Sequence, residues 1–98
     1  MNDLETLLQS RETKIVDVRT PNEFVGGHIE GSINIPLQVL PQHINDIRAM
    51  GQVVLCCASG GRSAIATDFL KANGIFCING GSWQNVYKLK TKDHAASN

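Results

Sequence analysis

Short apolar runs alternate along the chain with segments whose apolar residues fall at helical spacing. The runs cover residues 14–18, 33–35, 52–57 and 75–78, and the continuously apolar run at 52–57 is typical of a strand buried on both faces. Between the runs, apolar residues three and four positions apart predict helices. These residues are Leu4, Leu7 and Leu8; Leu40, Ile44 and Ile47; and Ile65, Ala66, Phe69 and Leu70. Alternating strands and helices predict an α/β fold with a parallel sheet covered on both faces.

Several residues mark where the predicted elements begin and end. Thr20, Pro21 and Glu23 stand at the N-cap, first-turn and capping-box positions of a helix. Asn73-Gly74 suits the left-handed geometry that closes a helix. Parallel α/β sheets carry their functional groups at the carboxyl ends of the strands. Cys57, at the end of the most apolar run, is therefore expected at the functional edge.

The 98 residues predict one small domain spanning 1–98, with residues 88–98 as a flexible tail because they carry no apolar stripe. The formal net charge is zero, which gives no electrostatic footprint for nucleic acid or an anionic membrane. The N-terminus is acidic where a secretory signal is basic, and no apolar run reaches the roughly 20 residues of a membrane span. A cytoplasmic location is expected. The sequence does not decide whether an export signal has been removed.

Three cysteines, two of them adjacent, do not form a disulfide framework and fit a reducing compartment. The three histidines are scattered and no C-x2-C pair occurs, so neither a metal site nor a cofactor is expected. The thiols at Cys56, Cys57 and Cys77 are instead candidates for chemistry of their own.

The stretch "LCCASGGRS" (55–63) allows two interpretations. Counted from Cys57 it is C-x4-R, and counted from Cys56 it is C-x5-R, both ending on Arg62. Gly60 and Gly61 permit a tight turn whose backbone N–H groups converge, with a helix N-terminus behind them. A cysteine at such a nest ionises easily and becomes a nucleophile. Because successive side chains of a strand point to opposite faces, Cys56 is expected on the other face of the sheet from Cys57, where its side chain only packs.

Three segments together resemble the single-domain rhodanese (sulfurtransferase) family. "IVDVRTPNEFVGGHIEGSINIPL" (15–37) is similar to its D-V-R, P-x-E-F and G-H-I-x-G segments, and "INGGSWQNV" (78–86) to its closing Gly-Gly segment. "VVLCCASGGRS" (53–63) is similar to its C-x-x-G-x-R-S loop, but only when counted from Cys57. The resemblance implies a small rhodanese-like domain with a central parallel sheet of four to five strands and helices on both faces.

The resemblance also implies a reaction. Cys57 would take sulfane sulfur from thiosulfate, a persulfide or a polysulfide, and a thiol, cyanide or an acceptor protein would remove it. The implied anion-binding loop consists of Ala58, Ser59, Gly60, Gly61, Arg62 and Ser63. Its amides would stabilise charge on the sulfur. Relatives that act on phosphate or arsenate have C-x5-R, usually with His before the cysteine, where this chain has Leu55.

Several residues around the loop keep two interpretations. Arg62 either attracts an anionic donor or pairs with a carboxylate to hold the loop. Asp17 and Arg19 are expected at the same edge as Cys57, Arg19 in an ion pair with Glu23. His28 is expected to hold loop geometry, and Trp83 to anchor the last helix. Cys77 is a candidate resolving thiol, if it ends a strand beside Cys57.

Two rival functions remain at this stage. One is a catalytically idle rhodanese-like module that binds a partner or senses redox state. The other is a phosphatase or arsenate reductase that uses Cys56. Ala58 and Ser59 are neutral, whereas family members with good thiosulfate turnover often carry a cation there, which argues against thiosulfate as the physiological donor.

Overall fold

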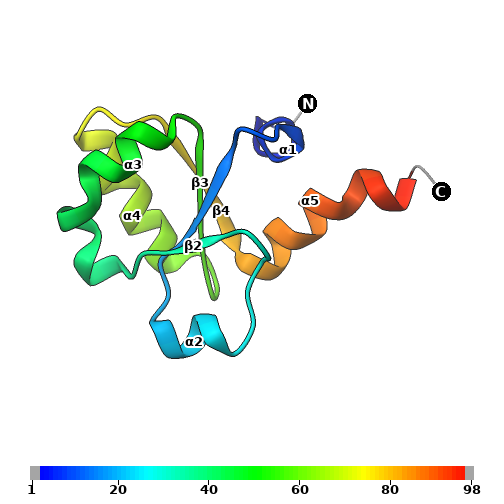
Figure 1. Ribbon diagram of the computed structural model, residues 1–98, viewed down its shortest axis with the longest axis horizontal. Coiled ribbons are helices and arrows are strands. Elements are labelled where there is room, and N and C mark those ends of the chain that lie inside the picture. The colour runs from blue at the N-terminus through cyan, green and yellow to red at the C-terminus, as the bar shows by residue number, and fades with distance from the viewer. Residues whose placement is uncertain (1–2, 97–98) are drawn as a thin grey trace.

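A four-stranded parallel sheet forms the centre of the computed structural model, which describes residues 3–96 and the side chains of residues 4–91. Figure 1 shows the strands in the order β2-β1-β3-β4. They span β1 (Lys14–Asp17), β2 (Ile33–Asn34), β3 (Val53–Cys57) and β4 (Cys77–Ser82). The parallel pairing brings the carboxyl ends of the strands to one edge, where Asp17 pairs with Cys56 and Cys57 pairs with Ser82.

Helices cover both faces of this sheet. They are α1 (Asp3–Gln9), α2 (Pro21–Val25), the 3₁₀ helix η1 (Leu37–His43), α3 (Ile44–Met50), α4 (Gly61–Ala72) and α5 (Trp83–Ala96). In Figure 1, α3 and α4 lie on one side of the sheet and α1 and α5 on the other, while α2 lies below the carboxyl ends of the strands. The predicted α/β fold is confirmed.

The two faces of β3 build two separate clusters of buried side chains. Val53, Leu55 and Cys57 point toward α3 and α4, and Val54 and Cys56 point toward α1 and α5, as the two-residue period of a strand requires. All five residues are at most 1% exposed. The uninterrupted apolar run is thus the result of burial on both faces.

The pairing between β3 and β4 contains an irregularity next to the functional edge. Leu55 pairs with Asn79 and Cys56 with Gly81, so Gly80 is an extra residue in β4. A Cβ atom at position 80 would lie 2.5 Å from Val86 Cγ2 and 2.9 Å from Val54 Cγ1. Only glycine allows α5 to pack this closely on the sheet.

Helix α2 begins as the sequence predicts. Thr20 Oγ1 accepts a hydrogen bond from the Glu23 N–H at 3.2 Å, and Glu23 Oε1 accepts one from the Thr20 N–H at 3.0 Å. This is a complete capping box. Gly74, with φ of +77°, follows the end of α4 in the expected left-handed conformation.

Three details of the predicted elements are wrong. The stripe at 40–47 is split between η1 and α3, because Pro41 lacks an N–H and disfavours α geometry at the residue before it. The run at 75–78 enters the sheet only at Cys77, leaving Phe76 61% exposed. Ile65, predicted to face the core from α4, is 60% exposed.

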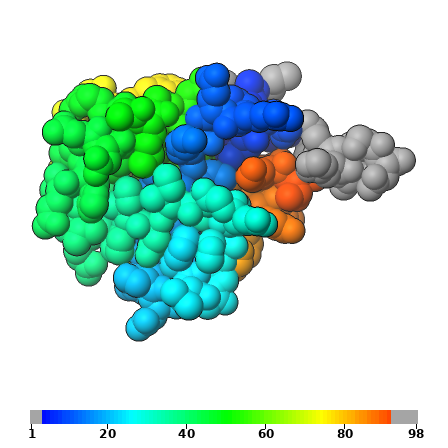
Figure 2. Space-filling view, viewed as in Figure 1, coloured from blue at the N-terminus to red at the C-terminus, as the bar shows by residue number. Residues whose placement is uncertain are grey.

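The C-terminal segment is helical through most of the predicted tail. Helix α5 continues to Ala96, and Leu89 packs against the cluster that contains Val86. Residues 97–98 of that prediction lie outside the described residues. The space-filling view shows the start of α5 (orange) against the α2–β2 segment (cyan) (Figure 2). Between residues 3 and 96, no helix combines the length and apolar character needed to cross a bilayer.

Candidate active site

The sulfur of Cys57 lies where β3 passes into α4. Sγ accepts hydrogen bonds from the backbone N–H of Gly60 at 3.0 Å and of Ser63 at 3.4 Å, and the thiol lies 3.4 Å from Ser63 Oγ. Cys57 is only 1% exposed. The donors come from the turn and from the first turn of α4, so the sulfur occupies an anion site at a helix N-terminus.

These donors determine the ionisation of Cys57. Burial raises the pKa of the thiol, but its hydrogen bond with the Ser63 side chain and those from the N–H groups of Ser63, Gly60 and Ser59 outweigh it, and the net pKa is lowered. A lowered pKa increases the thiolate fraction at neutral pH, and the thiolate is the reactive form.

Gly60 makes the turn possible. Its φ of +103° lies in the left-handed region, and a Cβ atom there would approach Gly81 Cα to 3.4 Å. The turn therefore rests on the backbone of β4 with no side chain between them. The sequence predicts Ala58 through Ser63 as the anion-binding loop. The structure directs the amides of Ser59, Gly60 and Ser63 at the sulfur and the Arg62 guanidinium elsewhere.

Asn79 supports this loop from β4. Its Oδ1 accepts hydrogen bonds from Ser63 Oγ at 2.6 Å and from the Gly81 N–H at 2.9 Å, while its Nδ2 donates to the Gly60 carbonyl at 3.4 Å. The pattern of residues around Asn79 in the sequence does not point to this role. Asn79 pairs with Leu55 of β3, whose side chain faces α4, and the hydrophobic pattern carries no signal for this pairing.

Cys56 has none of the features of a nucleophile. Its side chain is fully buried among Leu4, Val54 and Val86, and that burial raises the pKa of the thiol to about 12. The nearby Asp17 carboxylate contributes to this rise. The side chain fills space in the core, as the strand period predicts.

Cys77 lies at the amino end of its strand, whereas Cys57 lies at the carboxyl end of the neighbouring strand. It is the first residue of β4 and pairs with Val53, the first residue of β3, whereas Cys57 is the last residue of β3. Along the strand direction, Cys57 therefore lies four residues beyond Cys77, at about 3.3 Å for each residue. This separation is beyond the reach of a disulfide. The idea of Cys77 as a resolving thiol is therefore wrong. Its strand begins, rather than ends, at the cysteine.

Asp17 and Arg19 form a buried ion pair at the carboxyl end of β1. Arg19 Nη2 lies 2.8 Å from Asp17 Oδ2, and Arg19 Nε donates to both carboxylate oxygens. Nη2 also donates to the Gly27 carbonyl at 2.7 Å, and the guanidinium lies 5.1 Å from the centroid of the Trp83 ring. The predicted pairing of Arg19 with the Glu23 carboxylate is wrong, since Arg19 reaches only the Glu23 carbonyl, at 3.4 Å.

The Glu23 carboxylate instead pairs with Arg62. Two parallel hydrogen bonds of 2.7 and 3.0 Å join the guanidinium at the start of α4 to the carboxylate on α2. Of the two interpretations of Arg62, the structure shows the carboxylate pairing. Hydrogen bonds from Arg62 and from the Thr20 N–H lower the pKa of Glu23 to about 2, so it stays ionised at neutral pH.

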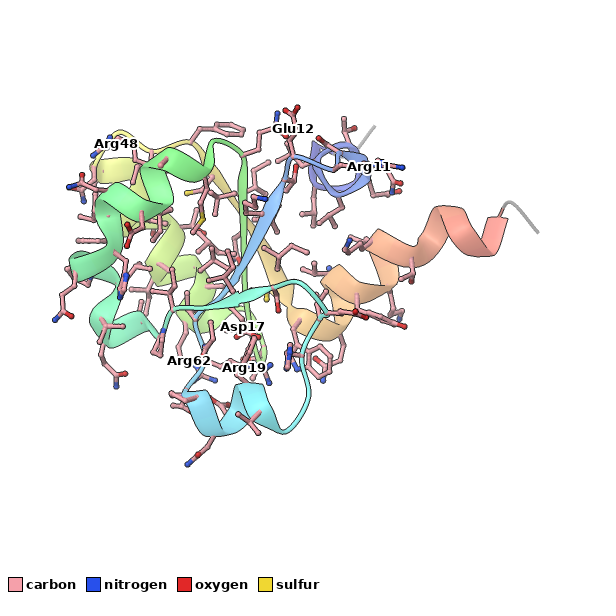
Figure 3. The ribbon with its side chains drawn as sticks, in the orientation of Figure 1. Arg11, Glu12, Asp17, Arg19, Arg48 and Arg62 are labelled. Carbon is pink, nitrogen blue, oxygen red and sulfur yellow. The ribbon has the colours of Figure 1, made fainter. Side chains whose placement is uncertain are left out.

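Figure 3 shows Asp17, Arg19 and Arg62 gathered between the carboxyl ends of the strands and α2. His28 and Trp83 lie near this group. His28 Nδ1 is 2.7 Å from the Phe24 carbonyl and its ring stacks on Phe24, consistent with a role in loop geometry. Trp83, at the start of α5, packs against the buried cluster that contains Cys56, as expected of an anchor. Its ring also lies beneath the Arg19 guanidinium.

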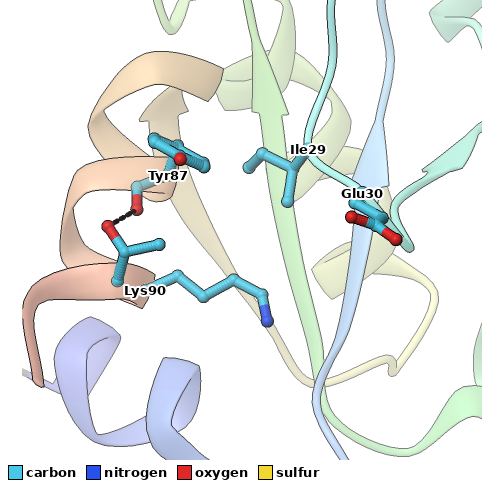
Figure 4. Close-up of a pocket in the computed structure, with 5 residues that line it drawn as sticks. Ile29, Glu30, Tyr87 and Lys90 are labelled. Carbon is cyan, nitrogen blue, oxygen red and sulfur yellow. Dashed lines mark hydrogen bonds between the residues drawn. The ribbon is translucent and has the colours of Figure 1, made fainter. Parts of the chain in front are cut away.

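A separate hollow lies between α5 and the loop after α2. It is lined by Ile29, Glu30, Tyr87, Lys90 and Thr91, and no residue of the Cys57 loop contributes to it (Figure 4). This hollow is therefore separate from the Cys57 site.

A cysteine sulfur held by loop amides at this place in a parallel α/β sheet agrees with the sequence comparisons. The profile of the family described as "Rhodanese-like domain" matches residues 1–89. The chain belongs to this family. The rhodanese-like domain here is 44% identical over 85 residues to the uncharacterized protein YqhL of Bacillus subtilis, which covers 84% of this chain and 68% of that protein.

Two further proteins are similar over most of this rhodanese-like domain. It is 29% identical to a protein named thiosulfate sulfurtransferase GlpE of Shewanella oneidensis, over 83% of each chain. The crystal structure of a rhodanese-like domain protein from Staphylococcus aureus superposes with a TM-score of 0.73 at 34% identity, covering 84% of this chain and 80% of the other.

Proposed function

We propose that this rhodanese-like domain is a sulfurtransferase that carries sulfane sulfur as a persulfide on Cys57. In the first half-reaction, the Cys57 thiolate attacks the outer sulfur of R–S–S⁻. The S–S bond of the donor breaks, R–S⁻ leaves, and Cys57–S–S⁻ remains. In the second, a nucleophile such as cyanide or a thiolate attacks the outer sulfur, and the Cys57 thiolate is regenerated. One covalent intermediate shared by two half-reactions gives ping-pong kinetics.

The observation that carries this proposal is the set of amides around the Cys57 sulfur. The N–H groups of Gly60 and Ser63 lie 3.0 and 3.4 Å from Sγ and favour its anionic form. The same nest is suited to the negative charge of a persulfide, whose outer sulfur extends from Sγ. The names of the relatives, sulfurtransferase and thiosulfate sulfurtransferase, support the same reaction class.

The geometry does not support a phosphatase that uses Cys56 as the nucleophile of a C-x5-R loop. A phosphatase nucleophile needs an accessible thiolate within the nest, whereas Cys56 is fully buried on the opposite face of β3 and has a raised pKa. An idle binding module does not require a thiol of lowered pKa, and the one at Cys57 favours turnover.

The substrates proposed are a small sulfur donor and a thiol, cyanide or protein acceptor, in the reducing environment of the cytoplasm. Intact-protein mass spectrometry tests the first half-reaction. The reduced protein, Cys57→Ser and Cys56→Ser are each exposed to thiosulfate and to polysulfide. We expect one added sulfur on the wild type and Cys56→Ser, removed by cyanide, and none on Cys57→Ser.

Two outcomes would overturn the proposal. No added sulfur on the reduced wild type would favour the binding module. Loss of the added sulfur in Cys56→Ser, with retention in Cys57→Ser, would restore the phosphatase frame.

A further inference from the structure

Both arginines at the carboxyl edge of the sheet are neutralised by carboxylates. Arg19 pairs with Asp17 and Arg62 pairs with Glu23. The remaining loop residues between Cys57 and Arg62 are Ala58, Ser59, Gly60 and Gly61, which carry no charge. Within the described loop and α2, a donor approaching Cys57 therefore meets no uncompensated cationic side chain.

This charge balance matters because the nucleophile is itself an anion. A thiolate repels an anionic donor in proportion to the charge on the donor. The N-terminus of α4, a helix of 12 residues, offers about half a positive charge. That partial charge offsets the same share of the repulsion for either donor, so the repulsion that remains is twice as large for a donor with two negative charges. Thiosulfate carries two, and a simple persulfide R–S–S⁻ carries one.

We infer that Glu23 determines donor specificity: by neutralising Arg62, it makes the site favour singly charged persulfides over the thiosulfate dianion. This inference rests on the proposed function. With a persulfide, the thiolate and R–S–S⁻ give Cys57–S–S⁻ and R–S⁻, two negative charges on each side. With thiosulfate, the products are Cys57–S–S⁻ and sulfite, and three negative charges must be accommodated throughout.

Glu23 is well held for this role. Its Oε1 accepts hydrogen bonds from the Thr20 N–H at 3.0 Å and from Thr20 Oγ1 at 3.2 Å, in addition to the two from Arg62. The carboxylate is therefore fixed to the N-terminus of α2, and it remains ionised at neutral pH. Arg62 is exposed to about 36%, so its charge faces the solvent through which a donor arrives.

The test compares two donors that differ in charge. Thiosulfate and benzenethiosulfonate both transfer an outer sulfur to a thiolate, but the second carries a single negative charge. The quantity measured is the ratio of kcat/KM for thiosulfate to kcat/KM for benzenethiosulfonate, with cyanide as acceptor. A ratio within one protein cancels differences in the amount of active enzyme.

Three variants change the charge of the pair in steps. Glu23→Gln leaves Arg62 uncompensated and should raise the ratio about tenfold, and Arg62→Gln should lower it about tenfold. The double variant restores neutrality, and its ratio should lie within about twofold of the wild type. Glutamine is accepted at this capping-box position, so Glu23→Gln keeps the N-terminus of α2. Glu12→Gln, the same change on the α1–β1 turn far from Arg62 in Figure 3, is the control and should leave the ratio unchanged.

The outcomes separate the inference from the proposed function. Opposite shifts in the two single variants, cancelling in the double variant, support the role of Glu23. Unchanged ratios in both overturn it while sulfur transfer stands. If Glu23→Gln does not fold, Arg62→Gln decides alone, since an unchanged or raised ratio there contradicts the inference. Failure of the wild type to take sulfur from either donor would overturn the proposed function itself.

Discussion

Cys56 and Cys57 are adjacent residues of one strand, yet the protein gives them opposite chemical character. Both are at most 1% exposed. Cys56 faces apolar side chains from α1 and α5, which raise its pKa to about 12. Cys57 faces the start of α4, whose amides lower its pKa. The comparison shows that burial alone does not determine thiol reactivity. The polar groups around the buried sulfur decide it.

The largest expected difference is in alkylation by iodoacetamide. The pKa of Cys56 is raised to about 12 and that of Cys57 is lowered, while the higher intrinsic nucleophilicity of the less acidic thiol recovers part of the difference in reactivity. Cys57 should therefore react at least about thirtyfold faster than Cys56 at pH 8. Peptide mass spectrometry after timed labelling measures both rates. In denaturant the rates should converge, and equal rates in the native protein would contradict the comparison.

Alkaline pH should lower the free energy of unfolding, because Cys56 ionises more easily in the unfolded chain. Its pKa is raised in the folded state, so its contribution to stability is complete below the unfolded value near 9 and is lost as pH rises toward 12. By pH 10 this loss amounts to about 1.4 kcal/mol in the free energy of unfolding. Urea unfolding of the wild type and Cys56→Val at pH 8 and pH 10 measures it. The same loss in both proteins would assign it to other groups.

Ser63→Ala should bring Cys57 closer to Cys56 in character. The variant removes the hydroxyl that contributes most to the lowering of the Cys57 pKa, so that pKa should rise. The pH profile of Cys57 alkylation reports the shift directly. Ser59→Ala changes an exposed side chain of the same loop and should leave the profile in place. A profile unmoved by Ser63→Ala would contradict the assigned role of the hydroxyl.

The smallest expected effect comes from Asn79→Ala. Asn79 is a positioning residue that acts through Ser63 and the Gly60 carbonyl, without touching the sulfur. Its loss should loosen the loop and slow sulfur loading of Cys57 a few-fold, with a smaller rise in the Cys57 pKa than Ser63→Ala gives. Asn45→Ala, on α3, is the matched control. A rise in pKa equal to that of Ser63→Ala would indicate that Asn79 fixes the Ser63 hydroxyl completely.

The sequence predicts the difference between the two cysteines, but it misses several of the contacts around Cys57. Strand period two separates Cys56 from Cys57, and the glycines and the helix start after Cys57 indicate a nest. Local spacing fails where the partner is distant in the chain. Arg19 and Glu23 are four residues apart and suggest a pair, but Glu23 pairs with Arg62, 39 residues away. Asn79 contacts Ser63, 16 residues away, through the pairing of β4 with β3, which the apolar pattern does not encode.

The near-complete enclosure of the Cys57 sulfur, at 1% exposure, has a consequence for the shape of its reagents. A narrow approach admits a terminal sulfur, which has a single bonded neighbour and projects beyond the rest of its molecule. Each sulfur of a disulfide carries a substituent, so neither can advance as far without carbon atoms meeting the loop. We therefore expect the enclosure to favour donors with a terminal sulfur over disulfides, and so to slow the formation of mixed disulfides on Cys57.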